Sequence, residues 1–264
     1  MTRRLPRALV AFTALCFLFL HGPVLVLAVF SFNHSRFSVQ WTGFSLEWYR
    51  RLLERQDILA ALRVSLTVGA VSTLVSTALG TLLALALARH RFRGRTTLEG
   101  LLYLPIVTPE IVMGISLLLL FATLRMGLGI PTIVVAHVAF SISFVAVVVR
   151  ARLEGMDRAL EEAALTLGAD EVATFRRVTL PLLWPGILAG ALLAFTMSID
   201  DFVITFFVSG PGSTTLPVLI YSMARRTIEP TINAVSTVIV VVTTVLIFFF
   251  DRLTRGRRPT EGAL

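Results

Sequence analysis

Long stretches of this sequence contain no charged residue, and they limit what the chain can fold into more than any other feature. Val64–Ala88, for example, holds no Asp, Glu, Lys or Arg. An α-helix needs about 20 apolar residues to cross a bilayer core of about 30 Å. Six stretches meet this requirement, at about residues 8–32, 64–88, 101–124, 130–149, 182–208 and 231–250. We therefore expect an all-α membrane protein with six transmembrane helices in a single domain over residues 1–264.

The composition excludes several other classes of protein. Of the residues, 56% are hydrophobic and 15% are charged, whereas about a quarter are charged in soluble domains. The net charge is +8, but the basic residues lie between apolar runs and not on one polar face, so nucleic acid is not an expected partner. The lone Cys16 lies inside an apolar run, where it is expected to pack as a small hydrophobe.

All 24 basic residues are Arg, and the chain has no Lys. A nucleotide-binding P-loop needs a Lys that reaches the phosphates. If ATP drives this protein, we therefore expect ATP and its Mg²⁺ to bind another subunit. We expect no cofactor, metal site or catalytic residue on this chain, and no H-E-x-x-H or G-x-S-x-G motif occurs in it.

The arginines predict the orientation, because cytoplasmic loops of membrane proteins carry an excess of them. With the N-terminus inside, sixteen of the 24 lie in the two tails and in the loops 89–100 and 150–182, and eight lie outside. Both termini are therefore expected to be cytoplasmic. The first apolar stretch follows Arg3, Arg4 and Arg7, and it is too long for a signal h-region, which favours an uncleaved anchor helix. Its His21-Gly22-Pro23 sequence is expected to break that helix.

Two outer segments are expected to form short helices. In the loop 33–62, Trp48 and Tyr49 favour an amphipathic helix at the membrane interface, which we interpret as a packed cap and not as a ligand site. Gly210-Pro211-Gly212 is expected to end the fifth span. A short helix within 213–228 would follow, either as an outer gate or as a dock for another protein.

The inner loop Arg150–Leu182 is longer than a connector needs to be. Apolar residues recur in it at helical spacings of three and four, at Leu153, Met156, Leu160, Ala164 and Leu167. Gly168 is suited to a chain reversal, and acids keep the other faces hydrated, at Glu161, Glu162, Asp170 and Glu171. These residues alone predict a surface helix–turn–helix, and they leave open whether it is only a solvated connector.

The spacing Glu162-Ala163-Ala164, Gly168, Val178 and Leu180-Pro181 resembles the EAA loop of ABC-importer permeases, which has Ile at the position of Val178. The resemblance implies the type I ABC-importer permease architecture and a bacterial inner-membrane location. In that family the loop is a coupling helix that docks in a groove of the ATPase. The residues that would couple to the ATPase are Glu162, Ala163, Ala164, Gly168, Leu180 and Pro181. The implied partners are a second homologous permease, a cytoplasmic ABC ATPase dimer, an extracytoplasmic solute-binding protein and membrane lipid.

Further stretches look like those of spermidine/putrescine importer permeases, in the same order along the chain. They are residues 31–37, 41–44, 48–49, 91–94, 109–112, 198–201, 216–217 and 220–223. This resemblance implies a polyamine as the transported solute. Importers of other small solutes share many of these motifs, so the residues leave the substrate open.

Three acids lie within the predicted spans, at Glu110, Asp200 and Asp201. An ionisable group at the helix centre costs about 2.5–3.5 kcal/mol, and such groups usually face a bundle interior or a water-filled path. At about 1.5 Å per residue, Glu110 would lie about 14 Å and Asp200 about 27 Å along their helices. Because neighbouring residues of a helix point about 100° apart, one of the two aspartates is left to cap or pair with another helix.

These acids favour a path for cations. We expect Glu110 and Asp200 to contact the ammonium groups of a polyamine, and Tyr221 or Phe206 to offer a cation–π face. The residues also allow a purely structural role for each of these acids. His137 is expected to form a hydrogen bond between helices. The rival class is an ion-coupled secondary carrier with the acids as proton sites, but it predicts internal repeats, and none is convincing here.

Overall fold

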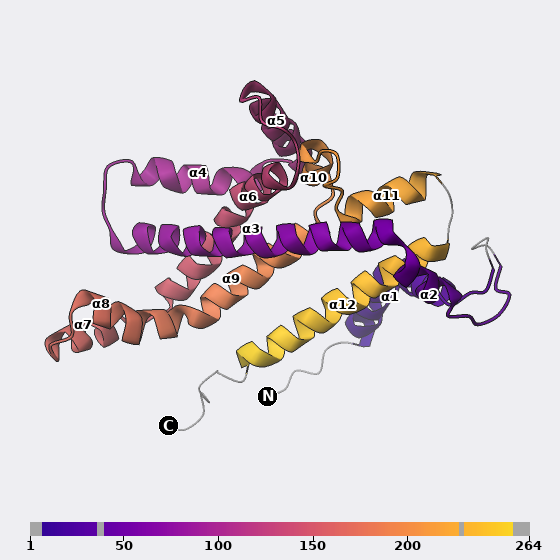
Figure 1. Cartoon of the computed structure of the whole chain (residues 1–264). Helices are drawn as coiled ribbons and strands as arrows, with labels where there is room; N and C mark the ends of the chain where they lie inside the picture. The colour runs from indigo at the N-terminus through magenta and orange to yellow at the C-terminus, as the bar shows by residue number, and fades with distance from the viewer. Residues whose placement is uncertain (1–6, 36–39, 227–229, 256–264) are drawn as a thin grey trace. The chain divides into compact units, whose positions relative to one another are not determined.

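The computed structural model describes residues 7–35, 40–226 and 230–255, and it is helical over most of them (Figure 1). Arg3, Arg4, the loop residues 36–39 and the tail 256–264, which entered the orientation and resemblance arguments, lie outside the described residues. The all-α expectation is confirmed for the described part, where one isolated bridge, Asn33 with Phe44, is the extended pairing found.

The helices divide between two compact units, one of residues 1–59 with 219–264 and one of residues 60–218. The first unit contains α1 (Arg7–Phe30), α2 (Glu47–Glu54) and α12 (Pro230–Arg255). The second contains α4 (Arg95–Val107), α5 (Glu110–Thr123), α6 (Ile130–Glu154), α7 (Ala159–Thr166), α8 (Glu171–Thr174), the π-helical turn η1 (Phe175–Thr179), α9 (Leu180–Asp200) and α10 (Val203–Val208). Two helices, α3 (Gln56–Arg89) and α11 (Leu216–Arg226), cross the division between the units.

Several of these helices can cross a membrane by length and composition. Four described helical segments qualify, Ala8–Phe30, Gln56–Arg89, Ile130–Glu154 and Glu171–Asp200. A fifth follows if the bent pair α4 and α5 counts as one span, and Pro230–Val245 forms a shorter apolar helix. Membrane-spanning helices are thus confirmed, whereas the count of six and the side of each terminus stay predictions.

The third expected span, 101–124, is not one continuous helix. It breaks between α4 and α5, which meet at 113° (Figure 1). The cause is local, because Pro109 disfavours the helical conformation in the residue before it, and Thr108 is extended with ψ 133°. Glu110 therefore becomes the first residue of α5.

The expected fifth span, 182–208, is also broken, because the chain becomes extended at Asp201 with ψ 122°. The expected break at His21-Gly22-Pro23 is wrong, since α1 runs through Pro23 as one helix. A proline inside an apolar helix is tolerated where local adjustment satisfies the freed backbone group.

Small residues set the packing of the unit 60–218. A Cβ on Gly80 of α3 would lie 2.8 Å from Cβ of Val145 of α6, and one on Gly190 of α9 would lie 3.2 Å from Cγ1 of the same valine. Glycines at such contacts let helices of a membrane protein approach closely. Val145 is fully buried in a cluster with Val149 and Leu183, so α6 is the central helix, packed against both α4 and α9.

In the other unit, α12 packs against α1 and α2. Trp48 of α2 is only 6% exposed, and its indole Nε1 donates to the carbonyl of Asn33 at 2.7 Å. The hydroxyls of Ser31 and Tyr49 lie 2.7 Å apart. The short helix expected in the loop 33–62 is confirmed, and its aromatic residues pack against the chain that follows α1.

Gly210 provides a test of the fold. A Cβ there would collide with the backbone carbonyl of Leu128, so Gly210→Ala should lower the free energy of unfolding by about 1–3 kcal/mol, as overpacking usually does. The matched variant is Gly100→Ala in α4, where a Cβ would meet nothing within 4 Å and Ala is the better helix former. Thermal unfolding in lipid nanodiscs measures both, and equal midpoints for the two variants would contradict this packing.

Candidate functional site

A cavity of about 450 Å³ lies in the unit 60–218, between the two helix breaks. Its walls come from the α4–α5 break, from α6 and from the α9–α10 break, and all three predicted acids line it, Glu110, Asp200 and Asp201. No basic residue of the described chain is part of its lining. The structure therefore brings together at one place the acids that the sequence separates by some ninety positions.

The breaks are the reason that these acids meet. In two straight helices, Glu110 and Asp200 would lie at different depths, but each instead lies at the point where its helix is interrupted. The helices beyond the breaks, α5 and α10, pack against each other. Their contact is close, since a Cβ on Gly114 would lie 2.7 Å from Cδ2 of Phe207.

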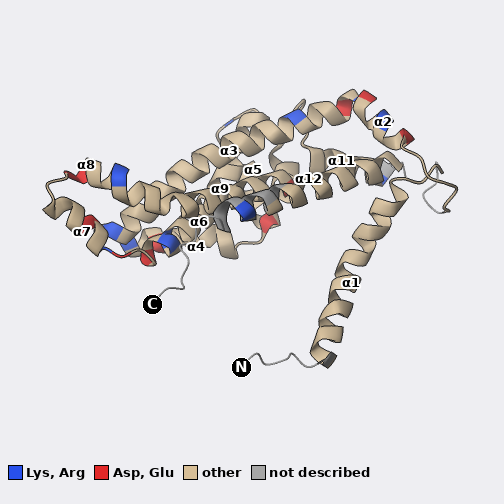
Figure 2. Cartoon of the chain, turned by 90° about the horizontal axis from the view of Figure 1, so that it is seen from below, with Lys and Arg blue, Asp and Glu red and all other residues tan. Residues whose placement is uncertain are grey.

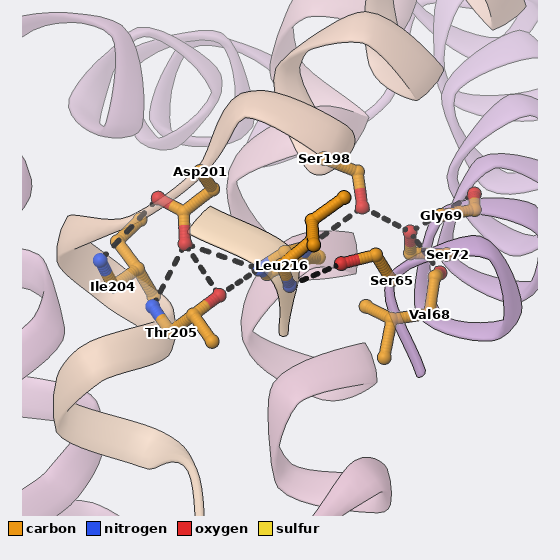
Figure 3. Close-up of polar contacts among 10 residues, drawn as sticks. Ser65, Val68, Gly69, Ser72, Ser198, Asp201, Ile204, Thr205 and Leu216 are labelled. Carbon is orange, nitrogen blue, oxygen red and sulfur yellow. Dashed lines mark hydrogen bonds and ion pairs between the residues drawn. The ribbon is translucent and has the colours of Figure 1, made fainter. Parts of the chain in front are cut away.

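Both carboxylate oxygens of Asp201 accept hydrogen bonds. Its Oδ2 accepts hydrogen bonds from the backbone N–H and the hydroxyl of Thr205, at 2.7 and 2.6 Å, and its Oδ1 accepts from the N–H of Ile204 at 3.3 Å (Figure 3). The first N–H groups of a helix have no acceptor within the helix, and a carboxylate near them is favourable. Asp201 is the aspartate that caps, and its side chain is 5% exposed.

His137 of α6 completes this polar cluster inside the protein. Its imidazole is fully buried, with Nε2 3.3 Å from Oδ2 of Asp201 and 3.0 Å from the hydroxyl of Thr205. Nδ1 lies 2.6 Å from the hydroxyl of Ser198, which lies 3.1 Å from that of Ser72 on α3 (Figure 3). The interpretation of His137 as an interhelical hydrogen-bonding residue is confirmed.

Glu110 and Asp200 differ from Asp201. Both residues are exposed and line the cavity. Among the described residues, neither side chain makes a hydrogen bond or an ion pair. Two carboxylates without partners at the wall of a cavity that lacks basic residues produce a negative potential there, which attracts cations.

Neither of the aromatic residues expected beside these acids is part of the cavity lining. Phe206 is 51% exposed on α10, and its ring packs on Phe202 and Phe207. Tyr221 belongs to the other unit, and the guanidinium of Arg225 lies 5.3 Å from its ring centre. The cavity wall instead carries Phe140, Phe144 and Phe202. Sequence reasoning missed them because the chain has 19 Phe residues, and no local pattern marks these three.

The inner loop forms the expected helix–turn–helix. Between α7 and α8 the chain reverses at Gly168, whose φ of +91° is in the left-handed region, and Asp170 caps α8 by accepting from the N–H of Ala173 at 2.6 Å. Of the predicted coupling residues, Glu162 and Ala163 are exposed on α7, Ala164 is half-buried, and Leu180 and Pro181 begin α9. Charged residues of this unit gather around α7, α8 and the N-terminal end of α4, whereas α3, α6 and α9 are mostly uncharged (Figure 2).

Glu161 is a correction to the sequence reasoning, which placed it on a hydrated face. Its carboxylate is 16% exposed and forms a two-pronged ion pair with Arg89, with both N–O distances 2.6 Å. It also accepts a hydrogen bond from the hydroxyl of Thr179 at 2.7 Å. The partners lie 72 and 18 positions away in the sequence, so no local spacing could indicate them.

The neighbouring aspartates provide a test of their different roles. Asp201→Ala should lower the free energy of unfolding by about 1–3 kcal/mol, because it leaves buried donors of α10 and His137 without an acceptor. Asp200→Ala, the matched change one residue away, should change it much less. Thermal unfolding of both variants in nanodiscs measures the difference, and an equal loss in both would contradict the capping role.

This sequence resembles a known protein family and known proteins over most of its length. The family model described as "Binding-protein-dependent transport system inner membrane component" matches residues 76–258. The putrescine transport system permease protein PotI of Escherichia coli K12 is 44% identical over 231 residues, which cover 85% of this chain and 82% of PotI. The spermidine/putrescine transport system permease protein PotC of the same strain is 41% identical over 229 residues, which cover 87% of each chain.

Solved structures show the same fold at lower identity. A chain of a bacterial ABC transporter that imports the polysaccharide alginate matches with a TM-score of 0.76 at 18% identity, over 96% of both chains. A chain of a methionine ABC transporter in an inward-facing conformation matches with a TM-score of 0.62 at 18% identity, over 80% of this chain and 98% of the other. Together with the family match and the apolar helices, these likenesses show that this chain belongs to the inner-membrane permease components of binding-protein-dependent ABC transport systems.

Proposed function

We propose that this chain forms half of the translocation path of an ATP-driven importer of polyamines, and that Glu110 and Asp200 bind the ammonium groups of the solute in transit. The observation that carries the proposal is the cavity that both carboxylates line, with no hydrogen bond or ion pair to either of them from the part of the chain that the structure describes. A diamine such as putrescine carries two cationic ends on an aliphatic chain. Two acids in one cavity provide a counter-charge for each end.

The remaining walls of the cavity suit the rest of such a solute. Binding sites for small molecules typically have volumes of about 300–1,000 Å³ and are mostly apolar, with a few polar groups that fix the orientation. This cavity of about 450 Å³ has Phe140, Phe144 and Phe202 in its wall beside the acids. Their rings can contact the methylene chain and attract an ammonium group through the ring face. The named activities of the relatives, putrescine and spermidine/putrescine transport, support the same class of solute.

We propose six spans for the membrane topology, α1, α3, α4 with α5, α6, α9 with α10, and α12. With an even number of spans, both termini lie on the same side. The excess of arginine in the tails and in the loops 89–100 and 150–182 supports the cytoplasmic side for both. The α7–α8 loop then lies in the cytoplasm, where ATP is available.

The α7–α8 loop is proposed as the dock for an ATPase dimer. Leu165 and Leu167 near the turn are 46% and 88% exposed, and Val172 of α8 is 65% exposed. Apolar side chains gathered on a polar surface are typical of a protein interface, and Glu162 beside them can pair with a basic groove. Because the chain lacks the Lys of a nucleotide loop, the ATPase must be a separate subunit. A second homologous permease and a solute-binding protein would complete the complex.

Alternating access would follow from the way these parts connect. The loop continues through η1 into α9, and Asp200 is the last residue of α9. Closure of the ATPase dimer would therefore move a helix that has the docking loop at one end and the binding acid at the other.

The cation site is tested by uptake of radiolabelled putrescine into proteoliposomes that contain the whole complex. Glu110→Gln and Asp200→Asn should each weaken the apparent affinity by about tenfold or more, since a hydrogen bond to a charged group contributes about 1.5–3 kcal/mol. Glu54→Gln makes the same charge change in an exposed helical ion pair and should leave uptake unchanged. Normal uptake in both site variants would refute the cation site, and uptake without ATP in a proton gradient would favour an ion-coupled carrier instead.

The docking role is tested with Glu162→Ala. Truncation of one partner of a desolvated interface pair costs about 2–5 kcal/mol, so the affinity for the ATPase subunit should fall by at least about tenfold. Glu54→Ala serves as the matched control. Surface plasmon resonance with the permease in nanodiscs gives the affinity, and unchanged binding by Glu162→Ala would show that this residue does not dock.

A further inference from the structure

We infer that Glu161, together with Arg89 and Thr179, forms a strut that transmits movement of the α7–α8 loop to the membrane helices. The inference rests on the proposed function, since it takes that loop as the ATPase dock. It assigns to Glu161 a positioning role that is separate from the docking role of its neighbour Glu162. Its basis is the set of contacts around one carboxylate.

The carboxylate of Glu161 joins three elements. Its two oxygens lie 2.6 Å from the two terminal nitrogens of Arg89, the last residue of α3. One of these oxygens also accepts from the hydroxyl of Thr179, the last residue of η1. Thr179 is followed directly by α9. A single side chain of α7 is thus bonded to the inner end of α3 and to the start of α9.

The contacts are of a kind that resists deformation. A guanidinium and a carboxylate that face each other with two parallel bonds have a fixed relative orientation as well as a favourable energy. The side chains of Arg89 and Glu161 are 24% and 16% exposed, so water screens this pair less than the open surface pairs of the chain. In the exposed pair of Arg50 and Glu54, by comparison, the side chains are 78% and 65% exposed.

Both helices that the strut joins continue to the candidate cation site. On α9, Asp200 lines the cavity, and Ser198 contacts His137. On α3, Ser72 contacts Ser198 at 3.1 Å. The loop is therefore connected to the region of the cavity through α3 and α9, which are linked to each other at two points. One link is Glu161, which joins Arg89 at the end of α3 to Thr179 just before α9, and the other is the contact of Ser72, midway along α3, with Ser198.

The adjacent residues Glu161 and Glu162 point in different directions from α7, and each direction suits a different role. Neighbouring residues of an α-helix point about 100° apart. Glu162 is exposed, and its side chain has no hydrogen bond or ion pair among the described residues, so it is available to a partner protein. Glu161 points inward to Arg89. A force that a partner protein applies to the exposed face of α7, at Glu162, is therefore transmitted to α3 through the face where Glu161 is bonded to Arg89.

The test is a charge swap in the complete transporter, with putrescine as the solute. Arg89→Glu and Glu161→Arg should each reduce the stimulation of ATP hydrolysis by the solute-loaded binding protein by about tenfold, the factor expected for loss of one charge-assisted pair, while the ATPase still copurifies. The double variant with both substitutions should recover most of the stimulation, because it restores the pair with its charges exchanged. The same swap of Arg50 and Glu54 should have no effect, singly or together.

A second measurement needs neither ATP nor solute. Chymotrypsin cleaves after Phe175 of the loop, a position that none of the substitutions changes. Cleavage there, in the permease alone in nanodiscs, should be faster in each single variant and return toward the original rate in the double variant. The milder variants Glu161→Gln and Thr179→Val should lie between the extremes if a charge reversal prevents folding. If the original complex shows no stimulation by the solute, the proposed function fails, but the cleavage pattern still decides whether the strut holds the loop.

Three results would overturn the strut. One is unchanged stimulation and cleavage in both single variants. Another is a double variant as impaired as the two single variants combined, since the pair would then contribute no mutual interaction. The third is loss of ATPase copurification in the single variants at unchanged cleavage, because Glu161 would then belong to the dock and not to the transmission.

Discussion

The structure depends on how backbone groups are satisfied where an apolar helix is interrupted. In a bilayer, an unpaired N–H or C=O costs several kcal/mol, so irregular backbone occurs only where protein or a water-filled cavity supplies partners. The break after α9 meets this condition through Asp201, which accepts from the N–H groups of Ile204 and Thr205. His137 and Thr205 in turn hold that carboxylate in place. The preceding Asp200 is then left facing the cavity.

This arrangement connects stability with function. The same break needs one acid for its own backbone and presents a second acid to the cavity, so two adjacent aspartates have different surroundings. An equivalent division occurs at the inner loop, where Glu161 is bonded inside the protein and Glu162 is exposed. In both pairs, one acid fixes the local structure and its neighbour is available to a ligand or partner.

The sequence predicted these features to different degrees. The apolar runs predicted the membrane helices, and the turn at Gly168 was correct because a left-handed residue favours glycine wherever it occurs. The three acids were expected to face a path, since a charge in a span is costly, and the structure places all three at the wall of one cavity. Pro105 and Pro109 both indicated a break near Glu110, but neither indicated the bend of 113° between α4 and α5, and α4 runs through Pro105. A proline can either kink a helix or end it, and α1 passes through Pro23 without a break, so the surrounding packing decides between these outcomes.

The sequence by itself determined that this is a helical membrane protein, because hydrophobicity and charge are properties of each residue and can be assessed without knowledge of the fold. It also excluded a nucleotide-binding P-loop in these 264 residues, since the lysine that such a loop requires is absent. Only the tertiary structure decided which acids share a cavity, which aspartate caps a helix, and that Glu161 is bonded to Arg89. Those contacts join residues far apart in the chain, and they depend on the angles at which helices pack and break, which no local spacing encodes.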